Sequence, residues 1–254
     1  MLLAIDVGNT HTVFGLYEQS TLRQHWRLAT ERGRTADEYG VVLRNLFAGC
    51  GHPHIAGIVV SSVVPPLSAV VDDLCRRYLG VVPLLVGPGV RTGMPIRYDR
   101  PQELGTDRLV NAVAAYARTH AATIVVDLGT ATKVDFVTAQ GEYAGGAIAP
   151  GLGIASDALF ERAAKLYRVE LVKPKHVVGR NTVHAIQSGL IYGYVALVDG
   201  LVTRIQKEHD VTARVIATGG FAPLIASESE TIQEVDEFLT LDGLRLIYER
   251  NSGQ

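Results

Sequence analysis

The chain has 254 residues, 47% of them hydrophobic, which is enough to bury one large core or two cores of roughly 120 residues each. Its 24 basic and 26 acidic residues are well mixed, so the charge pattern does not favour nucleic acid or a membrane as a partner. With only two cysteines, no signal peptide and no apolar run of about 18 residues, we expect a cytoplasmic protein that acts on a small molecule.

Three strands are predicted at the start of the chain. Leu2–Val7, His11–Tyr17 and Leu22–Ala29 are β-rich runs separated by short turns, which is typical of an antiparallel meander. Thr35 and Glu38 have the spacing of a capping box and open a predicted amphipathic helix. The next predicted elements are a strand at 55–60, a helix at 67–79 and a strand at 81–86. This alternation of strands and helices favours the α/β class.

Residues 87–108 show no regular periodicity and are rich in Gly, Pro and Arg. Long irregular segments inside compact domains are usually functional. The segment ends in Gly105, Thr106, Asp107 and Arg108, which open a predicted helix. Asp107 has two interpretations at this point: a cap of the helix N-terminus, or a catalytic carboxylate held beside Arg108.

An apolar strand that ends in an aspartate occurs twice. Residues 2–16, LLAIDVGNTHTVFGL, align without a gap with residues 123–137, TIVVDLGTATKVDFV, so that Asp6 matches Asp127. The chain therefore resembles two copies of one hairpin. The repeat predicts two domains, residues 1–118 and residues 119–254.

The repeated hairpin has the chemistry of an anion site. Gly8, two residues after Asp6, lets backbone N–H groups turn toward one point and form an anion-binding concavity. A carboxylate next to a phosphate needs a cation between them, so Asp6 predicts Mg²⁺ bound together with a nucleotide. Asp-x-Gly turns also occur in plain hairpins, but two copies, one near the start of each half, favour the functional interpretation.

The second half continues with predicted elements at 143–149 (strand), 151–165 (helix), 182–206 (helix) and 211–217 (strand). The apolar face of the long helix 182–206 is predicted to meet a core or a dimer partner, and Gly189 and Gly193 would permit close approach of another helix. The turn at residues 218–220 suits an adenine or ribose edge, or it is a plain strand-to-helix loop.

Five short motifs occur in order along nearly the whole chain: DVGNT (6–10), SSVVP (61–65), GTDR (105–108), DLGTAT (127–132) and GGAIAPG (145–151). Together they resemble the motifs of type III pantothenate kinases. The resemblance implies two ribonuclease-H-like, actin-like domains with a nucleotide cleft between them. It also implies a homodimer that phosphorylates the hydroxyl of pantothenate to 4'-phosphopantothenate with ATP, the first step of coenzyme A biosynthesis.

The resemblance assigns roles residue by residue. The ATP-binding residues would be Asp6, Val7, Gly8, Asn9, Thr10, His11, Thr12, Val13 and Thr130. The general base would be Asp107, and the pantothenate contacts would be Tyr98, Gly105, Thr106, Asp107, Arg108 and Thr182. Asp127 would be the ligand of a required monovalent cation, K⁺ or NH₄⁺, while Asp6 would hold Mg²⁺ through ATP.

Two departures from the family pattern bear on these roles. Thr106 stands where family members usually have alanine, a change that we expect to be harmless. Lys133 replaces a threonine, and the length of the preceding turn, which sequence does not fix, decides whether it shares the face of Asp127. On that face its ammonium would substitute for the monovalent ion; on the other it is a solvated lysine. Because Asp127 is kept, we expect dependence on K⁺ or NH₄⁺.

Two other functions remain open at this point. The chain resembles a family of kinases, but an actin-like nucleotide-binding regulator that has lost its chemistry would keep the same fold. An actin-like phosphatase, or a kinase for another hydroxylated metabolite, would also have this fold. Asp107 discriminates against the regulator, because a protein that only binds a nucleotide has no need of that carboxylate.

Overall fold

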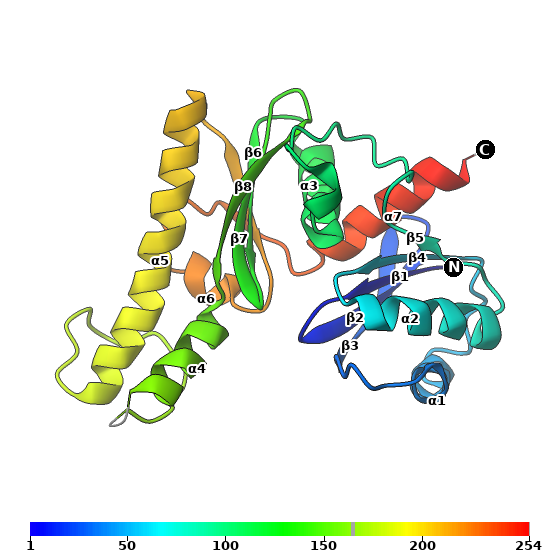
Figure 1. The fold of residues 1–254 in the computed structure, drawn as a ribbon, viewed down its shortest axis with the longest axis horizontal. Coiled ribbons are helices and arrows are strands. Elements are labelled where there is room, and N and C mark those ends of the chain that lie inside the picture. The colour runs from blue at the N-terminus through cyan, green and yellow to red at the C-terminus, as the bar shows by residue number, and fades with distance from the viewer. Residues whose placement is uncertain (164–165, 254) are drawn as a thin grey trace. The chain divides into compact units, whose positions relative to one another are not determined.

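The computed structural model describes residues 1–163 and 166–253, and the chain divides into two compact units. Unit 1 consists of Met1–Gly93, Arg100–Ala114 and the segment from Thr240 onward. Unit 2 consists of Met94–Asp99 and Ala115–Leu239. Figure 1 shows the elements of both units.

Unit 1 is built on a five-stranded sheet in the order β3-β2-β1-β4-β5. Its strands are β1 (Leu2–Val7), β2 (His11–Glu18), β3 (Thr21–Ala29), β4 (Gly57–Ser62) and β5 (Leu84–Leu85). The first three are antiparallel, as the meander predicts, and β4 and β5 continue the sheet in parallel with β1. The helical elements are α1 (Ala36–Ala48), α2 (Pro65–Tyr78), the 3₁₀ turn η1 (Pro101–Glu103) and the first part of α3 (Thr106–Thr119).

Unit 2 repeats this plan with the strand order β8-β7-β6-β9-β10. Its strands are β6 (Thr123–Leu128), β7 (Ala131–Val137), β8 (Tyr143–Pro150), β9 (Arg214–Thr218) and β10 (Glu234–Val235). Again three antiparallel strands are followed by two parallel ones. Its helices are α4 (Leu152–Arg162), α5 (Thr182–His209) and α6 (Ala222–Ala226). The matching strand orders confirm the predicted α/β class and its internal duplication.

Most predicted elements are present, with shifted ends. Thr35 and Glu38 form the predicted capping box of α1, because the Thr35 hydroxyl accepts from the Glu38 N–H and the Glu38 carboxylate accepts from the Thr35 N–H. The strand predicted at 81–86 is reduced to β5. The helix predicted at 151–165 corresponds to α4, which ends at Arg162, and residues 164 and 165 lie outside the described part of the chain.

The sequence-based boundary between residues 118 and 119 lies close to the division after Ala114. The end of the chain differs from the prediction, because residues from Thr240 onward belong to unit 1. Helix α7 (Leu239–Ser252) follows the second half in sequence, yet nearly all of it belongs to unit 1. The Tyr17 hydroxyl donates a 2.8 Å hydrogen bond to Asp242 Oδ1 and so ties α7 to β2. A contact that spans the whole sequence is invisible to local pattern analysis.

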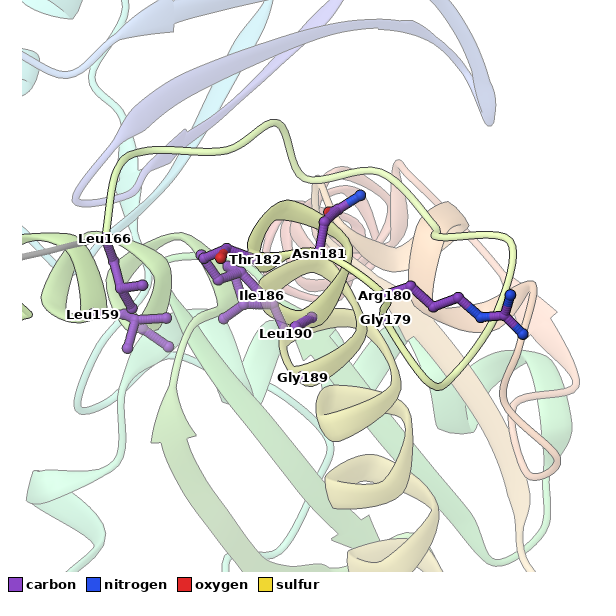
Figure 2. A pocket seen from close by; sticks show the side chains of 11 residues that line it. Leu159, Leu166, Gly179, Arg180, Asn181, Thr182, Ile186, Gly189 and Leu190 are labelled. Atoms are coloured by element: carbon purple, nitrogen blue, oxygen red, sulfur yellow. The ribbon is translucent and has the colours of Figure 1, made fainter.

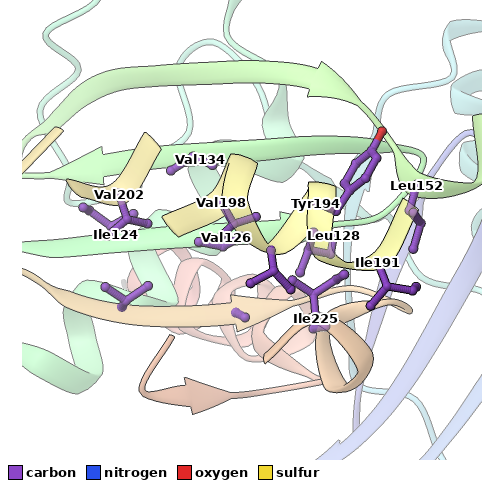
Figure 3. Close-up of a cluster of buried hydrophobic side chains, with 14 of the residues drawn as sticks. Ile124, Val126, Leu128, Val134, Leu152, Ile191, Tyr194, Val198, Val202 and Ile225 are labelled. Atoms are coloured by element: carbon purple, nitrogen blue, oxygen red, sulfur yellow. The ribbon is translucent and has the colours of Figure 1, made fainter. Parts of the chain in front are cut away.

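The core of unit 2 lies between α5 and the sheet. Figure 3 shows Ile191, Val198 and Val202 of α5 facing side chains of β6. The β6 residues at this contact alternate along the strand, and they are Ile124, Val126 and Leu128. Because successive side chains of a strand point to opposite faces, Asp127 lies on the face turned away from α5.

Among the described residues, α5 is the one helix whose length and composition would allow it to cross a membrane. Its apolar side chains Ile191, Val198 and Val202 are fully buried within unit 2. This burial is typical of the core helix of a globular domain.

Candidate active site

The first feature that the two sheets share is a carboxylate at the end of a buried strand. Asp6 is the sixth residue of the chain, and the turn 8–10 follows β1 directly. The Gly8 N–H donates a 3.0 Å hydrogen bond to the His11 carbonyl, and a Cβ on Gly8 would lie 3.0 Å from that same oxygen. Partial desolvation, followed by the nearby charge of Arg27, lowers the pKa of His11 and so favours the neutral imidazole, although the residue is exposed.

The end of β1 connects through β4 to the start of α3. Asp6 pairs with Ser61 in the parallel register of β1 and β4, so the two side chains share one face. Ser61 Oγ lies 3.0 Å from Thr106 Oγ1, and the Thr106 hydroxyl also lies 3.3 Å from the Ser62 carbonyl as a donor. Within unit 1, these contacts connect the Asp6 strand to the helix turn that carries Asp107.

Asp107 is the second residue of α3, and its carboxylate binds a backbone N–H of the first turn. Its Oδ1 accepts a 2.8 Å hydrogen bond from the backbone N–H of Arg108. A Cβ on Gly105 would lie 2.6 Å from Oδ1, so a glycine leaves the room that this carboxylate occupies. The Arg108 residue is only 5% exposed. The hydrogen bond from the Arg108 N–H fixes the direction of the Asp107 carboxylate. A catalytic role would also require a fixed direction.

The second strand-end carboxylate has a cationic partner. Asp127 on β6 lies directly opposite Lys133 on β7, and Lys133 Nζ donates a 2.7 Å hydrogen bond to Asp127 Oδ2. The turn between these strands has two residues, 129 and 130, whereas the turn of the first hairpin has three. Asp6 consequently lies opposite Val13, whereas Asp127 lies opposite Lys133. In the gap-free sequence alignment Val13 matches Val134, so the strand pairing of the second hairpin is shifted by one residue relative to the first. The short turn places Lys133 on the face of Asp127.

The other side of the Asp127 carboxylate is lined by glycine. A Cβ on Gly129 would lie 3.2 Å from Oδ1, and one on Gly219 would lie 2.9 Å from it. Gly219 has a φ of +94°, a conformation that L side chains rarely adopt. From the sequence, the turn 218–220 suits only a nucleotide edge or a plain loop. The parallel pairing of Asp127 with Thr218, which repeats the pairing of Asp6 with Ser61, was not visible in the sequence.

Two further predicted residues lie in different surroundings of unit 2. The Tyr98 ring is 6.1 Å from that of Tyr143 and lies beside Gly145. Thr182 is the first residue of α5, whose N-terminus is capped by Asn181 through a 2.8 Å bond from the His184 N–H.

Thr182 lines an open pocket of about 740 Å³ between α4, α5 and the segment before α5. Figure 2 shows Leu159, Leu166 and Ile186 forming its apolar part, while Arg180 extends away from them. Within unit 2, Thr182 therefore lines this pocket while Tyr98 and Asp127 do not.

The two units with matching strand orders define the class of the chain as a protein of the two-domain actin-like fold. The putative 2-dehydro-3-deoxygalactonokinase from Sinorhizobium meliloti superposes with a TM-score of 0.57 at 12% identity, over 100% of both chains. A structure from Campylobacter jejuni, described as a putative Baf family transcriptional activator, gives a TM-score of 0.62 at 18% identity, over 99% of this chain and 100% of that one. At these identities both likenesses concern the fold.

Comparisons with more similar sequences identify the family of the chain. A family model described as type III pantothenate kinase matches residues 2–204. The type III pantothenate kinase of Myxococcus xanthus (strain DK1622) is 56% identical over 253 residues, 99% of each chain. The chain belongs to the type III pantothenate kinase family, which confirms the resemblance inferred from the five motifs.

The contact between β4 and α3 is open to a direct test. Because Ser61 and Thr106 share a hydrogen bond and Ser61 is fully buried, we expect Ser61→Ala and Thr106→Ala to be non-additive. A double-mutant cycle followed by urea unfolding should give a coupling of about 1 kcal/mol. Ser20→Ala, in the exposed turn between β2 and β3, should combine additively with Thr106→Ala. Coupling near zero for the first pair would contradict this contact.

Proposed function

We propose that this chain transfers the γ-phosphoryl group of ATP to the hydroxyl of pantothenate, which yields 4'-phosphopantothenate and begins coenzyme A biosynthesis. The observation that carries the proposal is full-length identity of 56% to a type III pantothenate kinase, together with an Asp107 carboxylate fixed at the start of α3. ATP as the phosphoryl donor also supports the cytoplasmic location expected from the sequence.

Asp107 acts as the base of this reaction. The substrate oxygen attacks the γ-phosphorus, the bond to the β-phosphate oxygen breaks, and ADP leaves with that electron pair. Asp107 orients the substrate hydroxyl and accepts its proton, while Arg108 helps to fix the substrate. Positioning and charge neutralisation provide most of the rate in such transfers. The further pantothenate contacts that we propose are Tyr98, Gly105, Thr106 and Thr182.

The turn that follows Asp6 binds the phosphates of ATP. Residues 9–11 are exposed, and their side chains and backbone provide hydrogen-bond donors, as the strand-end turn requires. Among the described residues no group of three or more His, Cys, Asp or Glu side chains could hold a metal ion by itself. The proposed Mg²⁺ site needs no such group, because one carboxylate would share the ion with phosphate oxygens of ATP. In nucleotide sites, Mg²⁺ usually binds one or two carboxylates together with oxygens of the substrate. Asp6 would hold Mg²⁺, which would neutralise charge on the phosphates, and exposed Thr130 would be a further nucleotide contact.

The family resemblance also implies a monovalent cation at Asp127. In this chain the carboxylate already holds the Lys133 ammonium at 2.7 Å. A requirement for K⁺ or NH₄⁺ therefore stays a prediction, with the Lys133 ammonium as the competing cation at this carboxylate.

Rival functions make different demands on the same residues. A nucleotide-binding regulator needs the turn after Asp6 but not Asp107, so loss of Asp107 would leave its properties unchanged. A kinase for another hydroxylated metabolite needs both carboxylates and differs only in the acceptor. The activator named in Campylobacter jejuni shares the fold at 18% identity and carries no weight for the regulator.

A homodimer formed through α5 is supported by the exposed side of that helix. Four small exposed residues follow one another at helical spacing, namely Ala185, Gly189, Gly193 and Ala196. Nothing lies within 4 Å of a Cβ built on either glycine, so a second helix has room to approach. Close by in sequence, Val177 and Val178 are 63% and 78% exposed, which adds apolar surface for a partner to cover.

The role of Asp107 predicts the outcome of a conservative substitution. Asp107→Asn keeps the shape of the side chain but loses the base, so turnover should fall by about 10²-fold or more while the KM for pantothenate stays similar. Asp37→Asn is a matched control, because Asp37 is likewise the second residue of its helix, α1, and is exposed. Steady-state ADP release measures both variants, and near-normal turnover in Asp107→Asn would refute the assignment.

The role of Asp6 predicts a changed metal dependence. Asp6→Asn removes one charge directed at Mg²⁺, so the Mg²⁺ concentration for half-maximal rate should rise by about tenfold or more. The measurement is a Mg²⁺ titration at saturating ATP and pantothenate, with Asp37→Asn again as control. An unchanged titration would mean that Asp6 only shapes the turn.

The proposed dimer predicts a change of mass on substitution in α5. Gly193→Leu favours the helix locally but fills the space that a partner helix would occupy. We expect dimeric wild type and an increase of about tenfold or more in the dimer dissociation constant of the variant, measured by light scattering over a dilution series. Lys207→Thr, at the exposed end of α5, should remain dimeric. A monomeric wild type at micromolar concentration would exclude the dimer.

A further inference from the structure

We propose that the Lys133 ammonium takes the place of an exchangeable monovalent cation at Asp127, so that this kinase needs neither K⁺ nor NH₄⁺. The inference rests on the proposed kinase function and deepens it. It reverses the expectation from sequence, which favoured cation dependence because Asp127 is kept. The presence of Asp127 does not require an exchangeable ion, because the carboxylate binds the ammonium of Lys133.

The position of Lys133 follows from the register of the hairpin. Asp127 and Lys133 are directly opposed residues of antiparallel strands, and such pairs place their side chains on the same face. The two-residue turn at 129–130 enforces this pairing, since a turn of three residues would bring the next residue, Val134, opposite Asp127, as Val13 lies opposite Asp6. The ion pair is therefore fixed by the backbone as well as by charge.

The surroundings of the carboxylate leave the ammonium as its cation. Lys133 Nζ is 2.7 Å from Asp127 Oδ2, and the two side chains are 16% and 15% exposed. Gly129 and Gly219 approach Oδ1 from the other side. A second cation brought to the same carboxylate would meet the like charge of the ammonium, which disfavours its binding.

The chemistry of the ammonium matches that of the ion which it replaces. A lysine head group is a compact single charge with three donors, so it can serve Asp127 and further acceptors at the same time. Because it is covalently attached, it loses little translational freedom on reaching the site, whereas an ion from solution must be captured anew.

The first experiment compares rates in chloride salts. Wild-type rates of ADP release with pantothenate should agree within about twofold in K⁺, NH₄⁺ and Na⁺ at equal ionic strength. Lys133→Thr, which restores the residue usual in the family, should lose at least about tenfold in Na⁺ and recover in K⁺ or NH₄⁺. Lys207→Thr, an exposed lysine of α5, should behave as wild type.

The second experiment does not depend on activity. Thermal unfolding of wild type should show no difference between K⁺ and Na⁺, whereas Lys133→Thr should be stabilised by K⁺ in particular, because a bound ion stabilises the folded state. The wild-type measurements decide the question even if the variant fails to fold.

Three outcomes would overturn the inference. The first is a wild type at least about tenfold faster in K⁺ than in Na⁺. The second is a K⁺-specific rise in the unfolding temperature of wild type. The third is a folded Lys133→Thr variant that matches wild type in every salt. Absence of ADP release with pantothenate in all salts would instead refute the proposed function, and the unfolding experiment would still test the ion site.

Discussion

A carboxylate at the end of a fully buried strand is the constraint on which both units depend. Side chains of a strand alternate between faces, so the residues on either side of Asp6 and Asp127 supply the hydrophobic cores while the aspartates point the other way. Each aspartate strand lies between an antiparallel hairpin partner and a parallel neighbour, whose polar residue is Ser61 in one unit and Thr218 in the other. The fold thereby holds a charge at a strand end without burying it in the core.

The two hairpins differ by one residue in the length of the turn, and this difference decides which side chain lies opposite each aspartate. The hairpin of unit 1 has a three-residue turn and places the apolar Val13 opposite Asp6. The hairpin of unit 2 has a two-residue turn and faces Asp127 with a lysine. The same sheet order thus places an apolar residue opposite the aspartate of one unit and an ammonium opposite that of the other.

The sequence predicts what depends on local pattern. The strands β1 and β6 and the capping box at Thr35 follow from hydrophobic runs and from residue types at fixed spacing. The duplicated architecture followed from the repeat, and the family from five motifs. These features are properties of adjacent residues, so sequence is sufficient to find them.

Features set by pairing between distant residues could not be predicted. The Asp127–Lys133 ion pair depends on a turn length that the sequence does not fix. The contact of Ser61 with Thr106, and the docking of α7 through Asp242 onto Tyr17, join segments far apart in the chain. Their geometry is decided by tertiary packing.

The central claim, that this chain phosphorylates pantothenate, is tested most directly by its choice of acceptor. Coupled ADP release would be measured with ATP and Mg²⁺ against pantothenate and a panel of other hydroxylated metabolites. The account predicts a kcat/KM for pantothenate at least about 100-fold above that for any other acceptor, a discrimination within reach of a site that pairs polar groups of one substrate. Equal rates across the panel, or release that is independent of pantothenate, would contradict it.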